Sequence, residues 1–243
     1  MESVLALGHT LSDPDWSSPT ECPKWTVKDV YAHLIGGEQW MAEGHPRPED
    51  YEAWSAGPVQ ARRDTPPAAI LDELRKVYEY RLVQLEREPI DPAAPAHLPT
   101  GEPITMAAAL RTRVFDVWTH EQDIRRAVER PGNLASPAAA LTGEILVGLL
   151  PRIVAKDAKA APGATVRLTT TGEIDIDVAV IVDRSGKGRI VGPSRSAQTH
   201  LTMRWESYAR LSAGRGSRAD HDVRVTGDRA LGERVLSHLS IAP

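Results

Sequence analysis

The sequence contains a single cysteine, Cys22, among its 243 residues. One thiol cannot form an internal disulfide, which excludes a disulfide-stapled secreted domain and a two-thiol redox relay. The first residues, "MESVLALGHT", have no basic stretch ahead of their short apolar run, so no signal peptide is predicted. No apolar run approaches the length of a membrane span. These absences predict a cytoplasmic protein with no membrane partner.

The sequence also has no excess of positive charge. Its 29 Lys and Arg residues against 33 Asp and Glu residues give a net charge of −4, so nucleic acid is not an expected partner. The glycine pairs at Gly36 and Gly37, and at Gly214 and Gly216, lack the spacing and strand context of a dinucleotide or phosphate loop. No G-x-S-x-G nucleophile elbow is present.

The two halves of the chain follow different patterns. Residues 1–156 are predicted to form helices, which we expect over residues 2–11, 26–44, 66–88, 105–130 and 136–156. Residues 157–243 contain β-branched segments at 164–171, 173–183, 188–192 and 221–227, with helices expected at 202–214 and 228–240. The prediction is an all-α domain, an up-and-down four-helix bundle, over 1–156, followed by a smaller α+β domain over 157–243.

Three polar residues share one face of the helix predicted near residues 105–130. Asp116, His120 and Asp123 are spaced by four and three residues, which places them on one side of a helix, beside its apolar stripe. A carboxylate and an imidazole four residues apart can reach the same metal ion. The same spacing also fits an Asp and a His that merely contact each other at the edge of a core.

His33 lies in the middle of another predicted helix, among apolar residues such as Val30 and Leu34. A single histidine in this setting is often a hydrogen-bonded core residue. Facing helices of a bundle can instead build a shared site. His33 together with Asp116 and His120 would supply three protein ligands and leave one position open, as in catalytic zinc sites.

Two sequence runs carry a resemblance to a known family. "CPKWTVKDVYAHL" and "VFDVWTHEQDIRRAVERPG" resemble the DinB-like, mycothiol-dependent maleylpyruvate isomerase family, with its C-x-x-W-T-x-x-x-x-x-x-H-L opening and [E/D]-x-x-x-H-x-x-D helix. The segments "YARLSAGRGS" and "VRVTGDRALGERVL" are similar to the C-terminal domain of that family, a fold related to sterol carrier proteins. The resemblance covers nearly the whole chain.

The resemblance implies a divalent metal, usually zinc, bound by His33, Asp116 and His120. Many members have Glu where this chain has Asp116, so the shorter side chain must bring helix and metal closer together. Asp123 matches the second acid of the family and is expected to orient an imidazole. A surface role for Asp123, paired with Arg126, is the alternative.

The implied chemistry uses a thiol activated by the metal. The resemblance names mycothiol as that thiol and a small electrophile as its partner, with isomerisation or S-transfer as the outcome. Cys22 has no histidine near it in the sequence and is expected to pack as a small apolar residue. Among the arginines, Arg215 is predicted to bind a substrate carboxylate, with Arg111 and Arg113 as alternatives, whereas Arg204 and Arg218 are expected on the solvated surface.

Two other functions stay open from the sequence. The second domain could hold an apolar ligand while the bundle retains a vestigial metal site, which would make the protein a binding protein. Water in the open metal position would instead make it a metal-dependent hydrolase, active without any thiol. The protein is expected to be a monomer or a homodimer.

Overall fold

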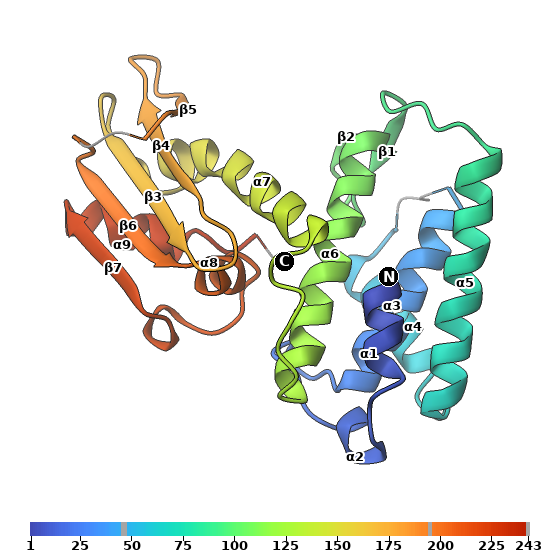
Figure 1. Cartoon of the computed structure of the whole chain (residues 1–243). Helices are drawn as coiled ribbons and strands as arrows, with labels where there is room; N and C mark the ends of the chain where they lie inside the picture. Colours follow the sequence, from blue (N-terminus) through green and yellow to red (C-terminus); the bar gives the residue numbers. More distant parts are fainter. Residues whose placement is uncertain (45–47, 194–195, 242–243) are drawn as a thin grey trace. The chain divides into compact units, whose positions relative to one another are not determined.

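The computed structural model describes residues 1–44, 48–193 and 196–241 of the chain. They form two compact units, Met1–Gly132 and Asn133–Pro243, and each is described by itself below. The first unit is helical and the second contains the large sheet, as the sequence predicts (Figure 1). The division falls at residue 132 rather than at 156, because the helix that follows residue 136 packs within the sheet unit.

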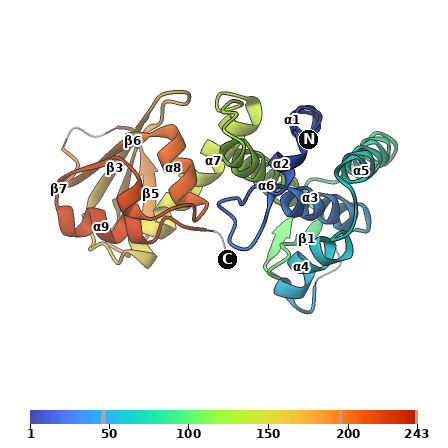
Figure 2. The same cartoon turned by 90° about the horizontal axis from the view of Figure 1, so that it is seen from below.

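Helices dominate the N-terminal unit. They are α1 (Glu2–Gly8), α2 (Asp13–Trp16), α3 (Val27–Ala42), α4 (Tyr51–Ala61), α5 (Pro67–Arg87) and α6 (Met106–Ala127). Figure 2 looks along several of these helices and shows α3 between α5 and α6. Helix α4 and a short antiparallel hairpin, β1 (Pro95–His97) with β2 (Pro103–Thr105), were not predicted.

Helix α3 is fixed at its first turn and along its length. The side chain of Thr26 accepts a hydrogen bond from the backbone of Asp29, while the Asp29 carboxylate accepts from the backbone of Thr26, forming a capping box. The hydroxyl of Tyr31 donates to the carbonyl of Val4 at 2.8 Å. The core around it is apolar and includes Val27, Val30, Leu34, Ile35, Ile70, Leu74 and Ile124.

The N-terminal helix is also joined to α6. Ser3 Oγ donates to Glu121 Oε1 at 2.6 Å, and Arg125 Nε donates to the same oxygen at 2.8 Å. Arg125 Nη2 donates in turn to Ser3 Oγ at 3.2 Å. Glu121 is almost completely buried, and these charged hydrogen bonds satisfy its carboxylate. They hold α1 against the C-terminal half of α6, where Glu121 directly follows His120 in the sequence.

The C-terminal unit is built on a five-stranded sheet with the order β5-β4-β3-β6-β7. Only the central pair, β3 with β6, is parallel. The elements are α7 (Pro137–Arg152), a π-turn (Ile153–Asp157), β3 (Thr165–Thr171), β4 (Asp177–Val182), β5 (Gly188–Val191), β6 (Thr199–Arg204), α8 (Trp205–Ser212), a 3₁₀ turn (Arg218–Asp220), β7 (Val223–Gly227) and α9 (Arg229–Ser237).

One strand was taken for a helix. The prediction of a helix over 202–214 was wrong at its start, since residues up to Arg204 belong to β6 and α8 begins at Trp205. The strand alternates buried and partly exposed residues, with Leu201 and Met203 facing the core. The alternation of buried and exposed residues is only six residues long and is followed directly by a helix, so it was not recognised as a strand.

The prediction that no apolar run has the length of a membrane span was wrong for α7 and the residues that follow it. The continuous helical stretch Pro137–Asp157 has the length and apolar composition that a membrane span requires. In the structure α7 packs against β4, β5 and α8 of its own unit. Buried residues such as Leu146 and Leu150 face that core. In the structure, 39% of the most apolar window of this stretch is buried.

Candidate metal centre

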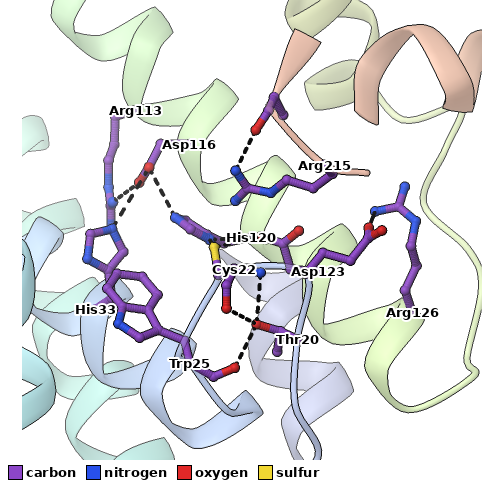
Figure 3. Close-up of polar contacts among 12 residues, drawn as sticks. Thr20, Cys22, Trp25, His33, Arg113, Asp116, His120, Asp123, Arg126 and Arg215 are labelled. Atoms are coloured by element: carbon purple, nitrogen blue, oxygen red, sulfur yellow. Dashed lines mark hydrogen bonds and ion pairs between the residues drawn. The ribbon is translucent and has the colours of Figure 1, made fainter. Parts of the chain in front are cut away.

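Helices α3 and α6 bring the three predicted ligands together. Asp116 Oδ1 lies 3.9 Å from His33 Nε2 and 3.5 Å from His120 Nε2. His33 and His120 are both buried, whereas a third of the Asp116 side chain is exposed. Figure 3 shows the two imidazoles on either side of the carboxylate. Two nitrogens and one oxygen converging in this way are a donor set that fits a divalent metal such as zinc.

Arg113 holds the carboxylate of Asp116 in this orientation. Its Nη1 donates to Asp116 Oδ2 at 2.5 Å, which leaves Oδ1 toward the histidines. The guanidinium also donates to Glu38 Oε1 at 2.9 Å and to the carbonyl of Leu34 at 2.7 Å. These contacts engage Arg113 inside the helical unit. They argue against its predicted alternative role as a binder of a substrate carboxylate.

Gly37 makes room for that guanidinium on α3. A Cβ atom at this position would lie 2.3 Å from Arg113 Nη1 and 2.7 Å from its Cζ. Such distances are far inside van der Waals contact, so any larger residue would displace Arg113. The glycine that showed no nucleotide-binding pattern in the sequence is therefore a packing glycine.

The other nitrogen of His120 faces Asp123 and Cys22. His120 Nδ1 lies 3.1 Å from Asp123 Oδ2, and Cys22 Sγ donates to the same carboxylate oxygen at 3.4 Å. Cys22 Sγ is also 3.8 Å from His120 Nδ1. Asp123 has no exposed surface. Arg126, its alternative partner from the sequence, pairs with Glu21 at 3.2 Å.

The expectation for Cys22 was wrong. The thiol was predicted to pack as a small apolar residue because no histidine is near it in the sequence. The fold brings it to His120, 98 residues later. The loop is shaped by Thr20, whose hydroxyl donates to the Trp25 carbonyl at 2.9 Å and accepts from the Cys22 backbone at 3.2 Å.

Aromatic rings surround His33. The Trp25 ring lies 4.7 Å from the His33 ring and 6.0 Å from that of His120, measured between centroids. Trp54, from the unpredicted helix α4, meets His33 edge-on at 5.9 Å. On its other side Trp54 lines a pocket with Trp40, Gly36 and Pro58. The cluster thus has apolar walls.

Burial and the charges inside the cluster determine the pKa values of His33, Asp116 and His120. Burial lowers the pKa of His33 below its ordinary value, so this imidazole is neutral at pH 7. Burial acts the same way on His120, but the Asp116 carboxylate outweighs it and raises the pKa of His120 well above the ordinary value. Burial alone would raise the pKa of Asp116, yet the charge of His120 holds it well below its usual range.

The remaining predicted residue, Arg215, lies in the C-terminal unit. Its Nη1 donates to the carbonyl of Ala213 at 2.5 Å, and its own carbonyl lies 3.1 Å from His221 Nε2. Arg204 and Arg218 pair with acidic residues of the same unit, Glu173 and Glu233 respectively, both at 3.5 Å. The Arg204 side chain is two-thirds exposed, as expected for a surface residue.

Several residues of the cluster were not recognised from the sequence. Cys22 and Trp25 belong to the quoted run "CPKWT", and Arg113 stands three residues before Asp116 on one helix face, so each had a local signal. Glu38 and Trp54 had none, because only the packing of α3 against α6 and α4 brings them to the site.

Three comparisons relate this chain to known proteins. The family described as the mycothiol maleylpyruvate isomerase N-terminal domain matches residues 1–125. A crystal structure of mycothiol-dependent maleylpyruvate isomerase is similar in fold, with a TM-score of 0.55 at 17% identity, over 93% of this chain and 88% of that one. A histidine-to-alanine mutant of that isomerase gives a TM-score of 0.56 at 16% identity, with the same coverage. No curated protein sequence matches the chain.

The family match spans just over half of the chain and includes His33, Asp116, His120 and Asp123. The solved structures extend the likeness in fold to the C-terminal sheet unit. The chain therefore belongs to the mycothiol maleylpyruvate isomerase N-terminal domain family.

Proposed function

We propose that this protein is a metal- and mycothiol-dependent enzyme acting on a small electrophile, by S-transfer or by cis–trans isomerisation. The observation that carries the proposal is the convergence of His33, Asp116 and His120 from two helices, with one carboxylate oxygen facing both imidazoles. The family membership supplies the thiol and the reaction class. We further propose a cytoplasmic location, since the chemistry needs a reduced thiol.

Three protein ligands suit a catalytic metal because they leave a coordination position for another molecule. A divalent metal bound there would lower the pKa of an entering thiol and so supply a thiolate at neutral pH. The Asp116 side chain is shorter than the glutamate of many relatives. Its Oδ1 nonetheless reaches within 3.5 Å of His120 Nε2, so the shorter acid fits this cluster.

The surrounding residues prepare the ligands. With a metal on Nε2, Asp123 would accept a hydrogen bond from His120 Nδ1–H and thereby keep the Nε2 lone pair on the side of Asp116 and His33. Arg113 keeps the second oxygen of Asp116 occupied, so that Oδ1 remains the free ligand atom. These are positioning roles.

The aromatic walls favour a small, partly apolar electrophile. Trp25 and Trp54 cover His33 and exclude water from that side of the cluster. For isomerisation, the sulfur would add to one alkene carbon, the resulting single bond would rotate, and the sulfur would leave again. For S-transfer, the sulfur would stay on the product. Arg215 remains our proposed binder of a substrate carboxylate, through its two-pronged guanidinium.

The first prediction concerns metal content. In a Cys22→Ser background, which removes the only thiol of the chain, we expect about one zinc ion per chain. Adding His33→Ala or Asp116→Ala should reduce it to near zero, because two ligands hold zinc far more weakly than three. Elemental analysis after gel filtration measures this, with Arg111→Ala as a matched surface control. Full zinc retention in both ligand variants would contradict the site.

The second prediction concerns the thiol. Zinc-loaded protein should isomerise maleylpyruvate, or join mycothiol to an activated alkene, only when mycothiol is present. Product formation is followed by chromatography with and without the thiol, with His120→Ala as the inactive control. Turnover in water without mycothiol would instead identify a metal-dependent hydrolase. Zinc binding without any turnover would favour the ligand-binding alternative.

The third prediction concerns pH. Because the metal-free cluster holds a proton on His120, whose pKa is raised, zinc must displace that proton. Apparent zinc affinity should therefore fall as the pH falls below this raised pKa. The ion pair of His120 should stabilise the metal-free fold most below about pH 6.5, the ordinary histidine pKa. That stability is lost as the pH rises through the raised value.

Calorimetric titration of the Cys22→Ser protein with zinc, in buffers of different ionisation enthalpy at pH 7, measures the proton released by His120. Thermal unfolding of the metal-free protein from pH 6 upward measures the stability. A zinc-binding enthalpy that is the same in all buffers would contradict the charged state assigned to His120.

The fourth prediction concerns Gly37. The substitution Gly37→Ala introduces no polar group, yet its Cβ would displace the Arg113 guanidinium. Zinc affinity should weaken by roughly 10–100-fold, the usual effect of losing a residue that orients a metal ligand. Arg113→Lys should act in the same direction, because one ammonium cannot replace the forked contacts. Competition with a fluorescent zinc chelator measures both, and unchanged affinity in both variants would contradict a positioning role for Arg113.

A further inference from the structure

The two sides of the His120 ring face two different sets of possible ligands. Nε2 faces Asp116 and His33, as described above. Nδ1 faces Cys22 Sγ at 3.8 Å and Asp123 Oδ2 at 3.1 Å, and these two atoms are 3.4 Å apart. The second set therefore contains a thiol, an imidazole and a carboxylate, which are the three side-chain types that bind zinc most often.

The separations in this second set match a preformed zinc site. Zinc–sulfur bonds of about 2.3 Å and zinc–nitrogen or zinc–oxygen bonds of about 2.0–2.2 Å place tetrahedral ligand atoms about 3.3–3.6 Å from one another. The three observed distances scatter about this range by only a few tenths of an ångström. No backbone movement is needed to bring the donors around one ion.

We propose that Cys22, His120 and Asp123 form a second metal site, for a thiophilic divalent ion such as Zn²⁺ or Cd²⁺. We call it the thiolate site and the cluster of His33, Asp116 and His120 the open site. Binding releases the thiol proton of Cys22 and the Nδ1 proton of His120, and forms metal–sulfur, metal–nitrogen and metal–oxygen bonds. The thiolate makes the site softer than the open site and selects such ions.

The two sites exclude each other. A neutral imidazole has one nitrogen with a free lone pair and one that carries the proton. With a metal on Nε2, Nδ1 carries the proton and donates to Asp123. With a metal on Nδ1, Nε2 carries the remaining ring proton, and the open site keeps only His33 and Asp116. A chain loaded at the thiolate site therefore lacks the complete open site.

Burial gives the thiolate site a different character. Cys22, His120 and Asp123 are exposed by 9%, 7% and 0%, respectively, whereas the Asp116 side chain of the open site is one-third exposed. An ion held by the three buried donors has little access to a thiol or an electrophile. We infer that the thiolate site is a non-catalytic state of the same protein, favoured by soft metal ions.

Cobalt tests this assignment, because Co²⁺ bound to a thiolate has an intense sulfur-to-metal absorption band in the near ultraviolet. Cobalt bound only by histidine and carboxylate lacks this band. The decisive sample is full-length His33→Ala, which has lost a ligand of the open site and keeps all three ligands of the thiolate site. Asp116→Asn is a second sample of the same kind, in case His33→Ala does not fold. Both are titrated with Co²⁺ under a thiol-free reductant, with circular dichroism to check the fold.

We expect the band in both samples at one cobalt per chain, and its loss when Cys22→Ser is added. Cd²⁺ should displace the cobalt and remove the band. Cobalt bound without the band, or no cobalt bound by folded protein, would overturn the thiolate site. This outcome is separate from failure of the proposed enzyme, which is judged by zinc in the Cys22→Ser background and by thiol-dependent turnover.

Discussion

The Asp116 carboxylate is the constraint on which the cluster depends, since its two oxygens have different partners. Oδ2 is fixed by Arg113, and Oδ1 is the atom that both histidines face. Arg113 is itself held by Glu38 and by a backbone carbonyl of α3. The position of Asp116 Oδ1 therefore depends on how α3 packs against α6. Without Arg113, either oxygen could rotate toward the histidines, and the geometry would no longer be unique.

The second constraint is the imidazole of His120, because both of its ring nitrogens have partners. Each ring nitrogen faces a carboxylate, and the thiol of Cys22 lies on one side only. A metal bound at either nitrogen would therefore compete with a proton at this ring, and the position of one would decide which partner the other can take. In our proposals, this one ring both serves as a ligand of the open site and gives soft metal ions a second place to bind.

Much of the fold was predictable because its signals are local. The capping box at Thr26, the apolar stripe of α6 and the alternating residues of β3 each lie within a few turns or one strand. The strand β6 was missed because its six residues run straight into a helix. The domain boundary was placed too late because α7 is a helix, and its preference for the sheet unit comes from packing that the sequence pattern does not contain.

In the candidate site, too, local features were predictable from the sequence and long-range contacts were not. The spacing of Asp116, His120 and Asp123 on one helix is visible in the sequence, because residues three and four apart share a helix face. His33 lies on another helix, so from the residues alone it could be either a core histidine or a third ligand, and the family resemblance favoured the ligand. The position of Cys22 beside His120 could not be predicted, since it depends on how the loop before α3 meets a helix 98 residues later. Long-range contacts of this kind carry no periodic signal.

The hydrogen bond between Ser3 and Glu121 joins residues 118 positions apart, and this separation has a consequence for biosynthesis. Loop closure over such a distance waits until both ends exist, so α1 leaves the ribosome long before its partner on α6 is made. His120 is the immediate neighbour of Glu121. The three candidate ligands His33, Asp116 and His120 therefore cannot be brought together until almost all of the N-terminal unit has been translated.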